Sequence, residues 1–245
     1  MVITKDSGVS LARDVSHSRP HKTFKRAPVE PFEAFEPAIN RVLRACLFAG
    51  NEPAPPATVK RGDARNLPIQ DESIDLVITS PPYLNAIDYM RGHKLSLVWL
   101  GYNIAALRQI RGESVGTESG HSDKDGVEFD HITEAMGCVQ SLPTRLQRMI
   151  ARYVCAMDGV ISEVARVLIP QGQALIVVGD CTVRGVYIRN SMAIRLLAEE
   201  HKLELTWQRR RRIPDNKRYL PPPAQKSGKA LAKRLRTEVV MSFAK

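Results

Sequence analysis

A serine, two prolines and a tyrosine stand together at Ser80-Pro81-Pro82-Tyr83, and their chemistry suits a flat ring that bears an amino group. The Ser80 hydroxyl and the Pro81 backbone carbonyl can accept hydrogen bonds from N–H groups. An exocyclic amino nitrogen is a poor nucleophile because its lone pair is delocalised, so acceptors that hold its N–H groups can direct it toward an electrophile. The Tyr83 ring offers a face on which an unstacked nucleobase can rest. The alternative is a plain strand-to-loop turn with the tyrosine packed over it.

The residues before this turn predict the strand that positions it. The run 74–79 has apolar residues at Ile74, Leu76, Val77 and Ile78, followed by Thr79, and it is largely β-branched, with acidic residues before it and two prolines after it. Proline donates no backbone hydrogen bond and keeps the preceding residue out of helical conformation. We therefore expect a short buried strand that stops near Ser80. The turn would then lie at the carboxyl end of a strand, where open α/β sheets bind ligands.

The run Thr79-Ser80-Pro81-Pro82-Tyr83 resembles the catalytic motif of the amino-group DNA methyltransferases, which use S-adenosylmethionine. Upstream, Gly62-Asp63-Ala64, followed by Leu67-Pro68 and Asp75, is similar to the family segment that ends the preceding strand. The resemblance extends from about Val59 to the C-terminus. It implies an α/β fold with a Rossmann-like methyltransferase sheet.

The resemblance also implies roles for individual residues. The catalytic positions are Ser80, Pro81, Pro82 and Tyr83, and the cofactor-binding positions are Asp63, Ala64 and Thr79. The serine form of the motif is similar to that of the cytosine-N4 branch of the family, because the adenine-N6 branch usually has an aspartate at this position. The implied reaction is methyl transfer from S-adenosylmethionine to the amino group of a base flipped from double-stranded DNA, as in restriction–modification. The alternatives are methylation of adenine N6 or of an RNA base, and a truncated, non-catalytic DNA-binding fragment.

One part that the resemblance implies is not found in the sequence. The methionine part of the cofactor needs a strand, a glycine-rich turn and a helix. Phe48-Ala49-Gly50 lacks a second glycine and ends a predicted helix, so we reject it as that turn. Either the loop is degenerate, or the family's N-terminal portion is missing and a second chain supplies the cofactor loop.

Composition limits the class of protein. The 245 residues include 36 Lys and Arg against 26 Asp and Glu, a net charge of +10 that suits a polyanion such as DNA. The four cysteines have no zinc-like spacing, so we expect free thiols and no metal site. No run approaches the roughly 18 apolar residues of a membrane span. We expect a cytoplasmic protein without a membrane partner.

Two groups of basic residues are candidate DNA contacts. Arg91 and Lys94 follow the proline turn, and Arg209, Arg210, Arg211 and Arg212 form the densest basic run. Arginine pairs well with phosphates and with guanine edges. A solvated, charged surface is the alternative for both groups.

The domain organisation follows from composition and periodicity. We expect an irregular N-terminal segment at residues 1–56 with one helix over 37–48. At residues 57–245 the resemblance implies a methyltransferase-like domain, in which we expect a mobile insertion around 111–144. Helical spacing over 144–168, followed by an apolar strand at 174–178, predicts parallel strands joined by a helix. The remaining predictions are a helix capped by Asn190 or Ser191, a strand at 203–207 and a last, antiparallel strand at 237–243.

Overall fold

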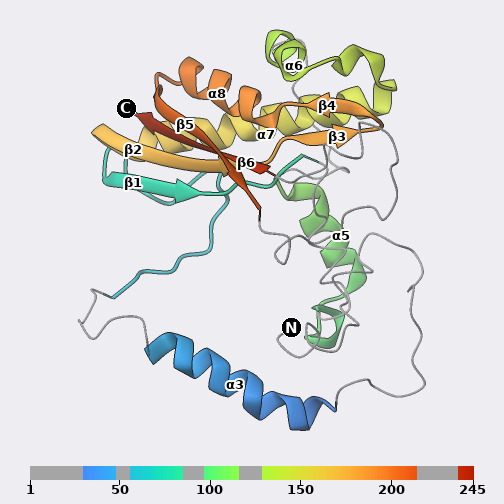
Figure 1. Cartoon of the computed structure of the whole chain (residues 1–245), viewed down its shortest axis with the longest axis vertical. Helices are drawn as coiled ribbons and strands as arrows, with labels where there is room; N and C mark the ends of the chain where they lie inside the picture. Colours follow the sequence, from blue (N-terminus) through green and yellow to red (C-terminus); the bar gives the residue numbers. More distant parts are fainter. Residues whose placement is uncertain (1–29, 48–55, 85–96, 116–128, 214–236) are drawn as a thin grey trace. The chain divides into compact units, whose positions relative to one another are not determined.

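The computed structural model describes residues 30–47, 56–84, 97–115, 129–213 and 237–245. Its contacts divide the chain into two units (Figure 1). Unit 1 comprises Met1–Arg61 and Asp88–Trp99, and unit 2 comprises Gly62–Ile87 and Leu100–Lys245.

Unit 2 is built on a four-stranded sheet with the strand order β1-β2-β6-β5. Strand β1 (Ile74–Thr79) is parallel to β2 (Leu168–Val178), and β6 (Thr237–Ala244) is antiparallel to both β2 and β5 (Glu204–Arg212). The predicted α/β fold, with a parallel pair and an antiparallel last strand, is confirmed.

The helices of unit 2 lie in the segments that connect the strands of the sheet. They are α5 (Ile104–Glu113), α6 (Asp130–Met136), the 3₁₀ helix η2 (Val139–Ser141), α7 (Thr144–Val167) and α8 (Asn190–Glu200). Helix α7 is the last helix in the connection between the parallel strands β1 and β2 and leads directly into β2. It confirms the helix predicted at 144–168, and its apolar stripe is buried from Met149 to Val167.

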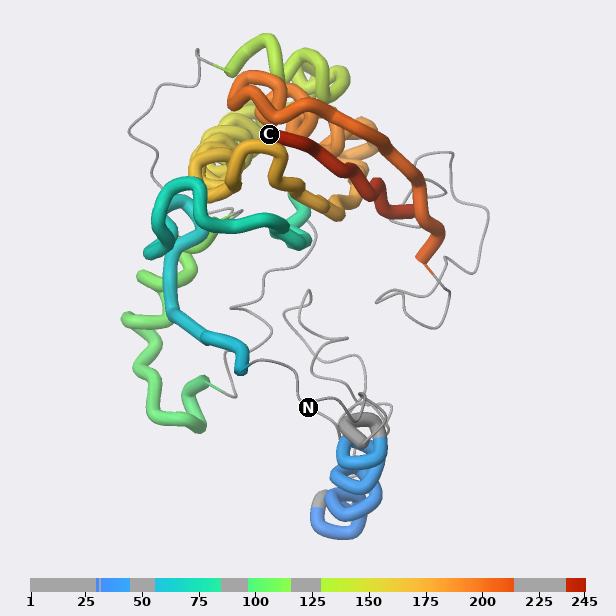
Figure 2. Tube along the Cα trace, turned by 90° about the vertical axis from the view of Figure 1, so that its left-hand side faces the viewer, coloured from blue at the N-terminus to red at the C-terminus, as the bar shows by residue number. Residues whose placement is uncertain are grey.

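Helices α7 and α8 cover one face of the sheet (Figure 1; Figure 2). On that face the buried side chains include Ala174, Ile176, Met241 and Phe243. The opposite face carries exposed apolar side chains at the outer strands. Leu76 and Ile78 of β1 are 51% and 67% exposed, and Trp207 of β5 is 43% exposed.

The prediction that β1 is buried is therefore wrong, although its position is confirmed. Among the described strands, β1 pairs only with β2 and forms an edge of the sheet. A β-branched run predicts a strand equally well at an edge and at the centre, because the preference reflects the pleated backbone rather than burial on both faces.

Several other boundaries differ from the sequence predictions. The strands predicted at 174–178 and 203–207 are longer, and residues 181–188 form the hairpin of β3 (Cys181–Val183) and β4 (Val186–Ile188). Within the stretch 111–144, Ile132 and Met136 of α6 are fully buried.

In unit 1 the described helix is α3 (Pro31–Leu47), which begins six residues before the predicted start and contains Pro37 internally. Its apolar side chains are largely exposed. Phe32 is 92% exposed and Phe35 57% exposed. None of the described helices has the length and the apolar content needed to span a bilayer.

The segment that leads into β1 is held against the end of α7 by one ion-pair cluster. Arg166 donates to the carboxylates of Glu163 and Asp71 and to the backbone carbonyls of Leu67 and Ile69. Glu163 in turn accepts a hydrogen bond from the Leu67 backbone N–H at 2.6 Å. These contacts order the chain before β1 and thereby set where its carboxyl end lies.

Candidate functional site

The carboxyl ends of three strands lie at the same end of the sheet, which we call its carboxyl edge. Strands β1, β2 and β5 run in the same direction, and β6, which runs the opposite way, begins at that edge. Register places Thr79 beside Ile176, and Arg211 of β5 beside Glu238 of β6. Polar residues that lie far apart in the sequence are therefore neighbours, as expected for a site at the carboxyl edge of an α/β sheet.

Ser80 and Tyr83 belong to a chain of polar contacts along this edge. The Ser80 Oγ lies 3.2 Å from the Tyr83 hydroxyl oxygen. The Tyr83 hydroxyl donates to Glu238 Oε1 at 3.0 Å. Arg211 donates to Glu238 Oε2 from Nη2 at 2.6 Å and from Nε at 3.2 Å. The predicted catalytic turn is thus tied to strands β5 and β6.

The turn itself is anchored by its apolar residues. Pro81 and Leu84 are buried, Pro82 and Tyr83 are half-buried, and Ser80 is exposed. The Tyr83 ring packs against the hydrophobic core. Burial, together with the hydrogen bond to Glu238, raises the pKa of Tyr83 to about 12, although the Ser80 contact acts the other way. Tyr83 is therefore a neutral hydroxyl at physiological pH.

Asp180 forms a second polar cluster where β2 ends. Its side chain is 5% exposed, accepts from the Tyr187 hydroxyl at 3.0 Å and accepts from the Ser191 backbone N–H at 3.0 Å. Arg210 Nη2 lies 3.7 Å from Asp180 Oδ2. Asp180 therefore accepts a backbone N–H of the first turn of α8, which has no partner within the helix. The prediction that Asn190 or Ser191 caps this helix is wrong, since both residues lie within it.

The predicted cofactor residues are spread over two elements. Asp63 and Ala64 lie in an exposed turn before β1, whereas Thr79 is the last residue of β1. Asp63 is engaged by Arg65, which donates from Nε to Oδ1 at 3.0 Å and from Nη2 to Oδ2 at 2.7 Å. This hydrogen bonding lowers the pKa of Asp63. Its carboxylate is ionised and already bound within the turn.

The arginine run lies on strand β5. Arg209, Arg210, Arg211 and Arg212 are all exposed in that strand. The Arg209 guanidinium lies 5.6 Å from the centre of the Trp207 ring, a cation–π distance. Arg210 and Arg211 face the two acids described above. The other predicted DNA contacts, Arg91 and Lys94, lie outside the described residues.

Sequence reasoning missed Glu238 and Tyr187. Asp180 had a usable signal because it follows an apolar strand directly. Glu238 had none, because it is separated from Tyr83 by 155 positions. Within the described residues, no group of three or more His, Cys, Asp or Glu side chains is placed to hold a metal ion.

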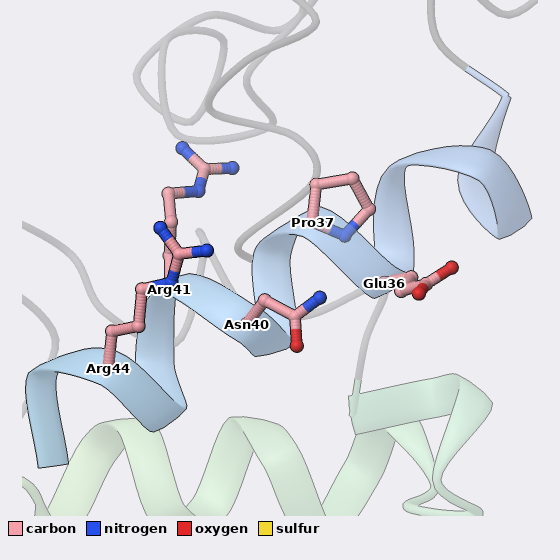
Figure 3. A pocket seen from close by; sticks show the side chains of 5 residues that line it. All are labelled: Glu36, Pro37, Asn40, Arg41 and Arg44. Carbon is pink, nitrogen blue, oxygen red and sulfur yellow. The ribbon is translucent and has the colours of Figure 1, made fainter. Parts of the chain in front are cut away.

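Unit 1 has a separate hollow on helix α3 (Figure 3). It is lined by Glu36, Pro37, Asn40, Arg41 and Arg44. All five come from this one helix.

Comparison with known proteins gave local and partial similarities. No protein-family model matches the sequence. Over 43 residues, which make up 18% of this chain and 8% of the relative, the sequence is 46% identical to the type II methyltransferase M.BsoBI of Geobacillus stearothermophilus.

The structure was also compared with solved structures. TTHA0409 of Thermus thermophilus, complexed with S-adenosyl-L-methionine, aligns with a TM-score of 0.41 and 17% identity over 75% of this chain and 53% of that chain. The cytosine-N4-specific PvuII DNA methyltransferase aligns with a TM-score of 0.40 and 18% identity over 75% of this chain and 47% of that chain. This chain thus spans about half the length of these two proteins.

Proposed function

We propose that this chain carries the base-binding part of an S-adenosylmethionine-dependent DNA methyltransferase that acts on an exocyclic amino group, most specifically cytosine N4. The observation that carries the proposal is the placement of Ser80 at the carboxyl end of β1, exposed and contacting Tyr83. The resemblance of Thr79–Tyr83 to the methyltransferase motif and the local identity to a type II methyltransferase support it.

The proposed roles follow from the groups at the turn. The Ser80 hydroxyl and the Pro81 carbonyl accept the N–H bonds of the amino group, and they hold its nitrogen toward the methyl donor. In the transfer the amino nitrogen would bond to the methyl carbon that S-adenosylmethionine supplies, the sulfonium–methyl bond would break to release S-adenosylhomocysteine, and the proton that the nitrogen loses would pass to water. Most of the rate enhancement then comes from positioning rather than from a protein nucleophile. Tyr83, half-buried against the core, supports the base with the exposed part of its ring.

The arginines of β5 are the proposed contacts to double-stranded DNA. They are exposed along one strand at the same sheet edge as Ser80. Arg91 and Lys94 are proposed as further phosphate contacts. Because phosphate contacts release counterions, each one should add to the salt dependence of DNA binding.

The described residues fit the cofactor only in part. S-adenosylmethionine supplies an electrophilic methyl group when it is bound. Asp63, Ala64 and Thr79 are the residues that we propose on this chain, but Arg65 occupies both oxygens of Asp63. No described residues form a strand, glycine-rich turn and helix beside β1, whose outer edge is unpaired among the described strands. We therefore propose that a further unit, from a second chain or from outside the described residues, completes the cofactor site.

Adenine-N6 methylation and RNA-base methylation are the alternatives within this class. A non-catalytic DNA-binding fragment is the alternative from another class, and the unpaired edge of β1 among the described strands favours it. Product analysis separates cytosine from adenine methylation, because N4-methylcytosine and N6-methyladenine differ in mass spectra of digested DNA.

The first experiment is calorimetric titration of the purified chain with S-adenosylmethionine, with and without duplex DNA, followed by transfer of a labelled methyl group to DNA. Ser80→Ala should abolish transfer while retaining the fold. Ser73→Ala is the matched control, because the Ser73 hydroxyl donates to the Gln70 carbonyl at 2.7 Å before the other end of β1. Transfer that persists in Ser80→Ala would remove Ser80 from the mechanism. A folded chain that binds DNA but not the cofactor would mean either that a second chain completes the cofactor site or that this chain is the non-catalytic fragment.

A further inference from the structure

Glu238 joins the catalytic turn to the arginine strand. It is the second residue of β6, and its side chain is 17% exposed. Its two oxygens have different partners: Oε1 accepts from the Tyr83 hydroxyl at 3.0 Å, and Oε2 accepts from Arg211 Nη2 at 2.6 Å. The carboxylate is therefore held on both sides in one orientation.

The number of protons in this chain of contacts decides which group donates at each one. The carboxylate of Glu238, paired with a guanidinium, only accepts hydrogen bonds, and a tyrosine hydroxyl has a single proton. Because Tyr83 gives that proton to Glu238, it has none for Ser80. The 3.2 Å contact between Ser80 and Tyr83 must then be donated by Ser80. The hydroxyl proton of Ser80 is therefore donated to Tyr83, and only the lone pairs of the Ser80 oxygen face outward.

We propose that Glu238 is a positioning residue that sets the direction of the chain Ser80→Tyr83→Glu238, so that the Ser80 hydroxyl presents only acceptors to an incoming amino group. This inference rests on the proposed function, since an acceptor is what an exocyclic N–H requires. In the opposite direction, Ser80 would receive a bond from Tyr83 and point its own proton toward the amino group. Two donors would then face each other.

The high pKa of Tyr83 agrees with this direction. Tyr83 keeps its proton at physiological pH because burial and the bond to Glu238 favour the neutral hydroxyl. The donor that the chain of contacts requires is therefore present under the conditions of the reaction.

Glu238→Gln tests the direction without changing the size of the side chain. Arg211 donates only, so it should attract the oxygen of the introduced amide and leave the amide NH₂ facing Tyr83. Tyr83 would then accept from that NH₂ and donate to Ser80, which reverses the direction. Placing two donors face to face at Ser80 should lower kcat roughly 10- to 100-fold, while KM for DNA changes little.

A second-site variant distinguishes reversal from general damage. In Glu238→Gln with Arg211→Met, no guanidinium holds the amide oxygen, so the introduced side chain can turn that oxygen toward Tyr83. At saturating DNA, we expect kcat of the double variant to recover most of the loss, relative to Arg211→Met alone. Glu199→Gln is the matched control, because Glu199 accepts from Arg195 at 2.8 Å within α8, away from the turn. An unchanged kcat in Glu238→Gln, or no recovery in the double variant, would overturn the proposal.

A measurement that needs no activity separates this inference from the proposed function. In protein labelled with ¹³C at the tyrosine Cζ, the Tyr83 signal, assigned by its loss in Tyr83→Phe, should titrate near pH 12 in the wild type. It should titrate at lower pH in Glu238→Gln, because the negative acceptor is gone. If Tyr83 titrates identically in both proteins, Glu238 does not hold its proton and the inference is wrong, whether or not the protein methylates DNA. If the wild type transfers no methyl group to DNA, either alone or with the chain that completes its cofactor site, although Tyr83 shifts as expected, the proposed function fails and the hydrogen-bond direction stands.

Discussion

Removing one oxygen atom from the turn Ser80–Tyr83 should weaken the fold in a pH-dependent way. Tyr83→Phe keeps the ring that packs on the core and deletes the hydroxyl that donates to Glu238 at 3.0 Å. Hydrogen bonds to charged groups contribute about 1.5–3 kcal/mol. Because Tyr83 is only half-buried and Arg211 still neutralises Glu238, we expect the low end, a loss of about 1.5 kcal/mol in the free energy of unfolding near neutral pH.

The pKa of Tyr83 gives this difference its pH dependence. The folded protein raises the pKa from 10.0 to about 12. A group whose pKa is raised by folding stabilises the folded state fully below its unfolded pKa, and this stabilisation is lost as the pH rises through the folded pKa. The full change would correspond to about 2.7 kcal/mol, and solvent screening at a half-exposed tyrosine reduces it to about 1.4 kcal/mol. About half of that, roughly 0.7 kcal/mol, should be lost by pH 11.

Urea unfolding of wild type and Tyr83→Phe at about pH 8 and pH 11 measures both quantities. The other titrating groups are common to the two proteins, so their effects cancel in the difference. We expect the stability advantage of the wild type to fall by roughly 0.7 kcal/mol between these pH values. Tyr102→Phe is the control, because Tyr102 is 48% exposed and precedes α5. An advantage that is constant with pH, or one no larger than that of Tyr102, would refute the assigned Tyr83–Glu238 hydrogen bond.

Three further outcomes are expected. Ser80→Ala should eliminate methyl transfer with an unchanged circular dichroism spectrum, and residual transfer at the wild-type rate would contradict its role. Arg209→Gln should reduce the slope of log K against log salt for DNA binding by about 0.9, the value of one phosphate contact, and an unchanged slope would mean that Arg209 only covers Trp207. Gly137→Ala should lower the free energy of unfolding, measured with urea, by about 1–3 kcal/mol. The reasons are that φ is +141° there and that a Cβ would lie 2.6 Å from the Tyr187 carbonyl oxygen. Gly101→Ala is the control that separates backbone strain from this clash, because φ is +90° there and no atom lies within 4 Å of the added Cβ.

Local sequence pattern accounted for the elements that carry the turn. The two prolines end β1 at Thr79 because neither can donate to a strand ladder. The apolar stripe of α7 predicted both its length and its buried face, since helical periodicity and burial are the same signal. The turn and its place after a strand were therefore readable from about ten consecutive residues.

The burial of a strand and the pairing of strands could not be predicted from local sequence in the same way. The pattern of β1 does not distinguish an edge strand from a central one, so the exposure of Leu76 and Ile78 became apparent only from the sheet order. The strand predicted at 203–207 ended before the arginine run, yet Arg209 to Arg212 belong to β5, because pairing with β6 satisfies their backbone hydrogen bonds.

The sequence by itself determined that a serine, two prolines and a tyrosine follow a strand, because strand propensity and proline stereochemistry act over a few residues. Only the tertiary structure decided what that turn contacts. Glu238 reaches Tyr83 across 155 positions because β6 lies between β2 and β5 in one register, which also sets Arg211 beside Glu238. Register across a sheet depends on the packing of all its strands at once, and no local pattern contains it.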